Sequence, residues 1–369
     1  MIKPLNYSIM DVLWSPIRAL SAKKIMVMTL SLLVSLLIYN LFTYLAFWID
    51  NDDISTIFNV YAFFPFYKMI FGNLSAQFLF YFGILCSVLT IMLGFTGVSI
   101  LEIEIIRGNR FMSPFAAIKF ALKRFKQLFL AELGIALFIG FIILLFMLFG
   151  LVGRIPYIGE WIYSILFVIP NLIIAILTVF IFAVFCVSVF LLPSVTAAER
   201  KGEAFQSILE TFSTIILQPL RWCYYTVWIL VSAKLASFVY AYFCYRSVQF
   251  IAWTTSITGG ENLKSLVKSS MALLPIRSDV VYHACNIFPG VDFSFSLVKY
   301  AKFASHGPVS YLMAFMVFVI FASVIGYFLT VLAVGQTRAY VVIRYLKDGY
   351  KIDNEEPEHA VKPRSEIIE

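Results

Sequence analysis

Six long apolar stretches, each flanked by polar residues, dominate the pattern of hydrophobic and polar positions along this chain. They cover about residues 25–48, 78–101, 128–152, 162–192, 222–245 and 311–334. Each is long enough to cross the roughly 30 Å hydrocarbon core of a bilayer, which takes about 20 residues of helix. Backbone N–H and C=O groups find no water in that core, so an apolar segment must satisfy them internally as a helix. The pattern predicts an all-α polytopic membrane protein with about six transmembrane helices.

The polar stretches between these spans carry helical patterns of their own. The segment from Leu191 to Tyr224 is typical, because an apolar run stops at Pro193, a polar turn follows, and a helix is expected over about 203–217. The apolar side of this helix consists of Phe205, Ile208, Leu209, Phe212 and Ile216. A shorter helix with one apolar side is expected over residues 8–22, broken at Ser15–Pro16. We expect both to be cytoplasmic amphipathic helices that lie in the membrane interface.

A basic helix between the second and third spans shows the clearest surface pattern. Ser113 can cap its N-terminus, and Pro114 suits its first position. Its apolar side consists of Phe115, Ile118, Leu122, Phe125 and Phe129, and its basic side of Lys119, Lys123 and Lys126. We expect these lysines, together with Arg221 before the fifth span, to bind anionic lipid headgroups.

The distribution of Lys and Arg predicts which side of the membrane each loop faces, because cytoplasmic loops carry an excess of these residues. The four segments expected inside hold 4, 6, 3 and 6 of them, whereas each of the two short outer loops holds one. The outer loop 246–309, with a helical patch at 262–274, holds six, but loops longer than roughly 60 residues are translocated largely regardless of charge. Residues 1–24 and the tail 335–369 are therefore expected in the cytoplasm. The first apolar run is expected to be a retained span rather than a cleaved signal peptide.

Composition agrees with a membrane protein and narrows the classes of function. Apolar residues make up 61% of the chain and charged residues 13%, whereas ordinary soluble domains have about 45–50% and about 25%. A formal charge of +7 would suggest nucleic-acid binding in a soluble protein. The cationic cytoplasmic loops of a membrane protein explain the same charge, so we expect no nucleic-acid partner.

The sequence offers no catalytic or cofactor motif. Its three histidines have no carboxylate or Cys at metal-ligand spacing, and no zinc-protease, phosphate-loop or nucleophile-elbow pattern occurs. The five cysteines show no C-x-x-C spacing. Only Cys244 and Cys285 could meet on the outer side, where either a disulfide or two unrelated packing residues would fit. We therefore expect no metal, no cofactor and no enzymatic activity.

Three polar residues within the apolar stretches are candidates for an intramembrane site. Lys234 lies near the middle of the fifth span, where a charge is functional by default but a long Lys side chain can also snorkel. Glu132, near the start of the third span, could pair with a lysine of the preceding helix or couple to an ion. Asn171, which follows a proline in the fourth span, marks either a ligand-binding helix break or a simple kink. Glu102 and Glu104, at the end of the second span, are expected to pair locally with a nearby arginine.

One stretch resembles a known group of proteins. Pro193…Glu199-x-x-x-x-Ala204-Phe205-x-Ser207…Pro219, preceded by an Ile155-Pro156-x-x-Gly159 turn, resembles a group of uncharacterised bacterial multipass inner-membrane proteins. It is more loosely similar to the membrane domain appended to some glycerophosphodiester phosphodiesterases. The similarity covers roughly 70 residues, and this chain has Leu209-Glu210-Thr211-Phe212 where an aromatic and Arg-bearing helix is expected. No phosphodiesterase domain accompanies it, so the resemblance implies only a multipass location in the bacterial inner (cytoplasmic) membrane.

Together these patterns favour a non-enzymatic integral membrane protein with an accessory, scaffold or lipid-organising role. Two alternatives stay open: a transporter or permease subunit that uses Lys234 and the Pro170–Asn171 helix break, and a lipid-modifying membrane enzyme. The expected partners are membrane lipids with anionic headgroups. A membrane-protein partner or a second copy of the chain would also fit.

Overall fold

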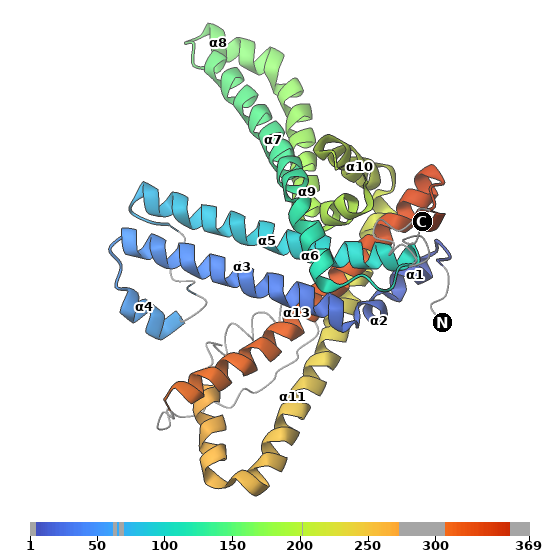
Figure 1. Ribbon diagram of the computed structural model, residues 1–369. Coiled ribbons are helices and arrows are strands. Elements are labelled where there is room, and N and C mark those ends of the chain that lie inside the picture. The colour runs from blue at the N-terminus through green and yellow to red at the C-terminus, as the bar shows by residue number, and fades with distance from the viewer. Residues whose placement is uncertain (1–4, 62–64, 66–69, 201, 273–306, 355–369) are drawn as a thin grey trace, which may run out of the picture. The chain divides into compact units, whose positions relative to one another are not determined.

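The computed structural model describes residues 5–61, 65, 70–200, 202–272 and 307–354, and every element assigned in them is helical (Figure 1). Six helical segments are long and apolar enough to cross a membrane: Ala22–Ile49, Leu74–Ile106, Phe125–Val152, Gly159–Ala198, Pro219–Val248 and Pro308–Asp348. Each predicted span lies within one of these segments. The all-α polytopic architecture with about six spans is therefore confirmed.

The helices divide into two units. The terminal unit comprises residues 1–18, 95–230 and 332–369, and the hairpin unit comprises residues 19–94 and 231–331. Three long helices contribute one end to each unit: α5 (Leu74–Ile106), α11 (Pro219–Ala272) and α13 (Pro308–Asp348).

In the hairpin unit, α3 (Ala22–Ile49) and α5 approach closely through small residues. Ser35 Oγ donates to the backbone carbonyl of Ser87 at 2.9 Å, and Ser87 Oγ donates to that of Ser35 at 3.2 Å. Gly94 leaves no room for a side chain, because an added Cβ would lie 2.6 Å from Ser31 Cβ. Without a hydrophobic driving force in lipid, such close packing and interhelical hydrogen bonds hold membrane helices together.

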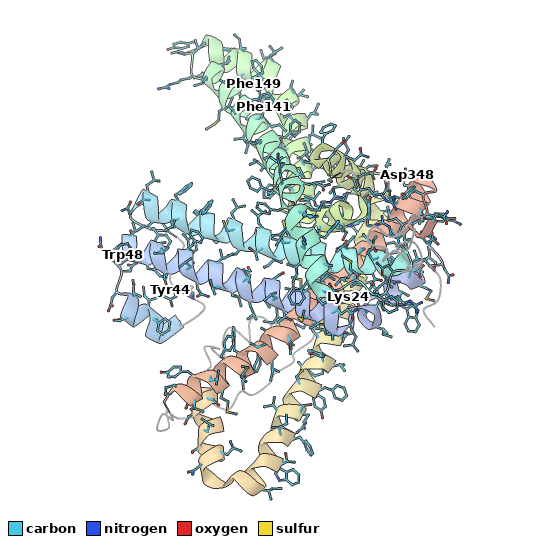
Figure 2. The ribbon with its side chains drawn as sticks, in the orientation of Figure 1. Lys24, Tyr44, Trp48, Phe141, Phe149 and Asp348 are labelled. Carbon is cyan, nitrogen blue, oxygen red and sulfur yellow. The ribbon has the colours of Figure 1, made fainter. Side chains whose placement is uncertain are left out.

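Aromatic residues fill the far end of this hairpin, where α4 (Ile54–Tyr61) follows α3. Phe47, Phe71 and Phe80 are buried in one cluster, with the rings of Phe47 and Phe71 5.6 Å apart. Asp50 accepts a hydrogen bond from the backbone N–H of Asn73 at 2.9 Å and so ties the end of α3 to the start of α5. Trp48, labelled at this end in Figure 2, is exposed. Aromatic rings at the end of a span suit the headgroup level of a bilayer.

The last two spans extend past their predicted ends. α11 is helical to Ala272, so residues 246–272 of the predicted outer loop, including most of its helical patch, belong to a long helix. α13 continues to Asp348, and residues 335–343 are buried, so the predicted tail begins as part of the helix. The prediction ended this span at its first polar residues, whereas tertiary partners satisfy those residues.

In the terminal unit, α7 (Phe125–Gly153) and α9 (Val168–Ala198) form a hairpin joined by α8 (Ile158–Ile162), and α10 (Ala204–Leu217) packs against both (Figure 1). Ile135, Ile139 and Ile142 of α7 pack with Ile181 of α9 in a small apolar core. Farther along α7 lie Phe141 and Phe149 (Figure 2). Phe141 is 56% exposed, as expected of a side chain that faces lipid rather than protein.

One feature of α9 differs from the prediction. The helix runs through Pro193 to Ala198, although a proline inside a helix costs about 3 kcal/mol. Every residue from 191 to 198 is buried, and this burial offsets the lost hydrogen bond. A π-helical turn, Tyr163–Phe167, precedes α9, and the fourth span is helical from Gly159 to Ala198.

Local start signals predicted other helices well. Ser113 Oγ accepts from the backbone N–H of Ala116 at 3.2 Å, and Pro114 is the first residue of α6 (Pro114–Lys123). The N-terminal segment forms α1 (Ile9–Leu13) and α2 (Ser15–Ala19), so its break falls at Trp14, one residue before the predicted Ser15–Pro16.

Candidate functional site

The structure places the predicted intramembrane residues in different surroundings. Lys234 lies half-buried on α11 in the hairpin unit. Glu132 and Asn171 are both buried in the terminal unit, on α7 and α9. Glu132 contacts Ser188, which lies about 25 Å farther along α9 than Asn171 at 1.5 Å per residue. Glu132 and Asn171 therefore do not share a site.

Asn171 has a structural partner. Its Nδ2 donates to the hydroxyl of Tyr163 at 3.3 Å, which links the start of α9 to the first residue of the π turn. A bond across the wide turn gives this buried amide a role in shaping the helix. The Pro170–Asn171 pair thus lies near the start of α9, and the Oδ1 atom of Asn171 is buried without a hydrogen-bond partner.

Glu132 binds a serine rather than a lysine. Ser188 Oγ lies 2.8 and 2.9 Å from the two carboxylate oxygens of Glu132 and 2.6 Å from the backbone carbonyl oxygen of Phe185. Lys123 and Lys126 are both exposed, and Glu132 makes no ion pair with any residue that the structure describes. The pairing with a lysine that the sequence suggested is not observed.

The four residues predicted to bind headgroups are exposed: Lys119, Lys123, Lys126 and Arg221. Large apolar side chains on and beside α6 share this exposure: Phe111, Phe115, Leu122 and Phe125. On α10 the buried positions include Ser207, Thr211 and Thr214, whereas the exposed ones include Phe205, Leu209, Ile216 and Leu217. Both helices thus expose apolar surface that their own unit leaves uncovered.

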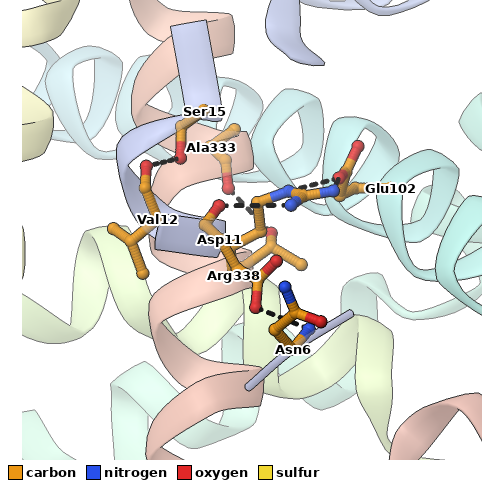
Figure 3. A network of polar contacts seen from close by, with 8 residues as sticks. Asn6, Asp11, Val12, Ser15, Glu102, Ala333 and Arg338 are labelled. Atoms are coloured by element: carbon orange, nitrogen blue, oxygen red, sulfur yellow. Dashed lines mark hydrogen bonds and ion pairs between the residues drawn. The ribbon is translucent and has the colours of Figure 1, made fainter. Parts of the chain in front are cut away.

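A buried ion pair joins α5 to α13 (Figure 3). Arg338 contacts Glu102 Oε1 through Nε at 2.6 Å and through Nη2 at 2.5 Å, and both side chains are almost fully buried. The third guanidinium nitrogen, Nη1, donates to the backbone carbonyl of Asp11 in α1 at 3.1 Å. The Asp11 carboxylate in turn accepts from the backbone N–H of Asn6 at 3.0 Å. One arginine therefore ties the second span, the sixth span and the N-terminal helices together.

Three hydroxyl groups meet between the same helices and α9. Ser99 Oγ lies 2.9 Å from Thr337 Oγ1 and 3.4 Å from Ser194 Oγ, and Ser194 Oγ lies 3.1 Å from Thr337 Oγ1. All three side chains are fully buried. The triangle fixes the rotation of α5, α9 and α13 about their axes, because hydroxyls in an apolar interior need mutual hydrogen bonds.

Two arginines cap the C-terminal end of α9. Arg124 Nη2 donates to the backbone carbonyls of Glu199 and Arg200, at 3.0 and 2.8 Å. Arg107 Nη2 donates to the carbonyl of Ala198 at 3.4 Å and also pairs with Glu104 at 3.5 Å. Cations at a helix C-terminus satisfy its free carbonyls and oppose the helix dipole. The predicted local pairing holds for Glu104, whereas Glu102 pairs with Arg338 from a distant span.

The Glu199 carboxyl is buried just behind these caps. Its Oε2 accepts from Ser207 Oγ at 3.4 Å, and Ser207 Oγ accepts from Gln127 Nε2 at 2.7 Å. Its Oε1 has no hydrogen-bond partner. Burial raises the pKa of Glu199 to about 7, although Arg344 and Arg124 act in the opposite direction. Glu199 therefore titrates near neutral pH at the end of a span.

Sequence reasoning missed Arg338 and Glu199 as central residues. A signal for Arg338 was present, because the polar run Gln336–Arg338 is followed by five apolar residues, 339–343, that continue the helix. Glu199 is one position of the pattern shared with bacterial inner-membrane proteins, but nothing in that pattern marks it as buried, because its surroundings include Ser207 of α10 and the Arg124 and Arg344 side chains. Its partners become visible only when the tertiary arrangement is known.

These features define a class: a multipass α-helical membrane protein whose polar side chains satisfy one another at the helix ends of the terminal unit. Among the residues described, no group of three His, Cys, Asp or Glu side chains could hold a metal ion. Cys244 is a free thiol, while Cys285 and all three histidines lie outside the described residues. Comparison with models of protein families, with curated proteins and with solved structures finds no match.

Proposed function

We propose that this chain is a non-enzymatic multipass protein of the bacterial inner membrane that organises anionic lipid at the cytoplasmic leaflet. The observation that carries the proposal is the exposed surface of α6, of the residues just before it and of the start of α7. Three cations and four large apolar side chains are exposed there: Lys119, Lys123, Lys126, Phe111, Phe115, Leu122 and Phe125. In a bilayer interface the apolar side chains enter the acyl boundary while the cations meet anionic headgroups, each cation contributing about 1 kcal/mol.

The exposed side of α10 supports the same placement. If this side of α10 faced water, exposing its apolar side chains would cost a free energy of roughly 25 cal/mol for each Å² of apolar surface. Contact with the membrane removes that cost. The polar side of α10 is already satisfied within the terminal unit, as when Thr211 Oγ1 donates to the Ser207 carbonyl at 2.7 Å. Arg221, exposed just after α10, would then lie at headgroup level.

The orientation, with both termini in the cytoplasm, is part of the proposal. It is supported by the polar contacts of the terminal unit, in which the ends of α5, α9 and α13 meet the start of α7. These are the same span ends that carry the excess of Lys and Arg. The bacterial location rests on the resemblance of residues 193–219 to bacterial inner-membrane proteins.

A lipid-binding measurement tests the proposal. The full chain is reconstituted in nanodiscs of phosphatidylcholine with increasing phosphatidylglycerol, and the bound anionic lipids are counted by native mass spectrometry. Replacing Lys119, Lys123 and Lys126 together by Gln should weaken anionic-lipid binding by up to about 3 kcal/mol. The matched triple Lys→Arg variant keeps the charge and should bind like the natural chain. Equal binding by the Gln and Arg variants would contradict the proposal.

A transporter is the second candidate, and one observation favours it. Glu132 is a carboxyl buried within a span, with no cationic partner among the described residues, and ionisable groups in that position are functional by default. If the chain transports a solute, Glu132→Gln in the third span and Lys234→Ala in the fifth span should each abolish uptake into proteoliposomes. Unchanged uptake of every candidate solute would remove this alternative.

A further inference from the structure

The hydrogen-bond geometry around Ser188 requires one more hydrogen than the serine supplies. Ser188 Oγ has a single hydrogen but three acceptor oxygens within 2.6–2.9 Å: the Phe185 carbonyl and both carboxylate oxygens of Glu132. The carbonyl is the nearest of the three, and it can only accept, so it takes the serine hydrogen. Two ionised carboxylate oxygens would then face the lone pairs of Ser188 Oγ. A proton on Glu132 resolves the conflict, because the acid can donate to Ser188.

The surroundings of Glu132 lead to the same state. Glu132 is 8% exposed, and the next turn of α7 contributes Ile135 to an apolar core. The charged groups on and next to the elements packed against this part of α7 are Lys119 and Lys123 on α6, Arg124 between α6 and α7, Lys126 on α7 itself, Glu199 and Arg200 after α9, Glu203 just before α10, and Glu210 on α10. Glu132 forms an ion pair with none of the cations, and Glu210 is paired with Lys347 at 3.0 Å. An unpaired carboxylate in such a place costs several kcal/mol, whereas a neutral, hydrogen-bonded acid does not.

We infer that Glu132 and Ser188 form an intramembrane proton-binding site, in which protonated Glu132 donates to Ser188 Oγ and Ser188 donates to the Phe185 carbonyl. Binding adds a proton from water to one carboxylate oxygen, and release returns it to water, so no other reactant is involved. Three other buried polar groups of the terminal unit, Gln127 on α7, Ser207 on α10 and Glu199 after α9, are joined by contacts of 2.7 and 3.4 Å. The inference goes beyond lipid organisation and does not depend on it.

Infrared spectroscopy of the full chain in nanodiscs at neutral pH tests the site. We expect a carbonyl-stretching band of a protonated carboxylic acid that is lost in Glu132→Gln, an isosteric change that can still donate to Ser188. In Ser188→Ala the band should persist but shift to higher frequency, because its hydrogen bond is gone. The control, Glu199→Gln, should leave the Glu132 band in place.

Two results would overturn the inference. One is a carbonyl-stretching band of a protonated carboxylic acid that Glu132→Gln leaves unchanged. The other is a band whose frequency is the same in Ser188→Ala as in the natural chain, which would show that the acid is not bonded to this serine. The serine variant retains Glu132 and decides the question even if Glu132→Gln fails to fold.

Discussion

Replacing Glu102 by Leu should destabilise the terminal unit by about 3–5 kcal/mol, because it leaves the Arg338 guanidinium buried without its counter-charge. The contacts support this magnitude. Arg338 loses one charged hydrogen bond, from Nε to Oε1 at 2.6 Å, and the ion-pair contact of Nη2 with the same oxygen at 2.5 Å, and a hydrogen bond to a charged group contributes about 1.5–3 kcal/mol. Only the bond from Nη1 to the Asp11 carbonyl, at 3.1 Å, remains.

The double variant Glu102→Leu/Arg338→Met should recover most of that loss. Removing both members of a buried pair and filling the space with apolar side chains is often neutral or stabilising, since neither charge then has to be desolvated. The effects of the two substitutions are therefore expected to be strongly non-additive, as is usual for residues in direct contact.

Equilibrium unfolding in mixed micelles of mild detergent and increasing dodecyl sulfate, followed by tryptophan fluorescence, measures these differences. Asp348→Asn is a matched control, because it breaks a 3.1 Å pair with Lys347 in which Asp348 is 44% exposed, and it should cost less than about 1 kcal/mol. A Glu102→Leu variant that costs no more than this control would refute the stabilising role of the ion pair, as would a double variant that loses as much stability as the two single variants combined.

Two further predictions use the same unfolding assay. The raised pKa of Glu199 means that the folded chain holds the carboxyl proton of Glu199 more tightly than the unfolded chain does. Protonated Glu199 therefore contributes its full stabilisation to the free energy of unfolding below about pH 4.5, and this contribution is lost as pH rises through about 7. Glu199→Gln should flatten the pH dependence of stability in that window, by roughly 1–2 kcal/mol after allowance for solvent screening, and an unaltered slope would assign it to another group. Gly94→Ala in α5 should cost about 1–3 kcal/mol, because its Cβ would lie 2.6 Å from Ser31 Cβ. Gly140→Ala in α7 meets no atom within 4 Å and should gain up to about 1 kcal/mol from helix propensity, so equal effects of the two substitutions would contradict the described packing.

The number and positions of the spans could be predicted because the thickness of hydrocarbon sets a minimum apolar length, and local capping at Ser113 and Pro114 predicted the start of α6. The ends of three spans, those of α9, α11 and α13, could not. Local rules treat Pro193 as a stop, yet α9 continues to Ala198, where Arg107 and Arg124 cap it.

The polar network was less predictable than the spans. Glu102 and Arg338 are 236 residues apart in the chain, and their contact depends on how α5 and α13 are rotated about their axes. Packing sets that rotation, and an apolar stretch with no marked hydrophobic side gives no sign of it. The headgroup role of Lys119, Lys123 and Lys126 stays a prediction.

The π turn at Tyr163–Phe167 also bears on where the length of this chain can vary. Each residue of an α-helix adds about 100° of rotation, so an inserted or deleted residue normally turns one half of a helix against the other. A deletion within the wide turn would convert it to ordinary helix and leave Val184, Ser188 and Leu191 facing inward. The same deletion after Asn171 would swing those side chains away from α7. The fourth span thus contains one place at which evolution can add or remove a residue without disturbing its packed half.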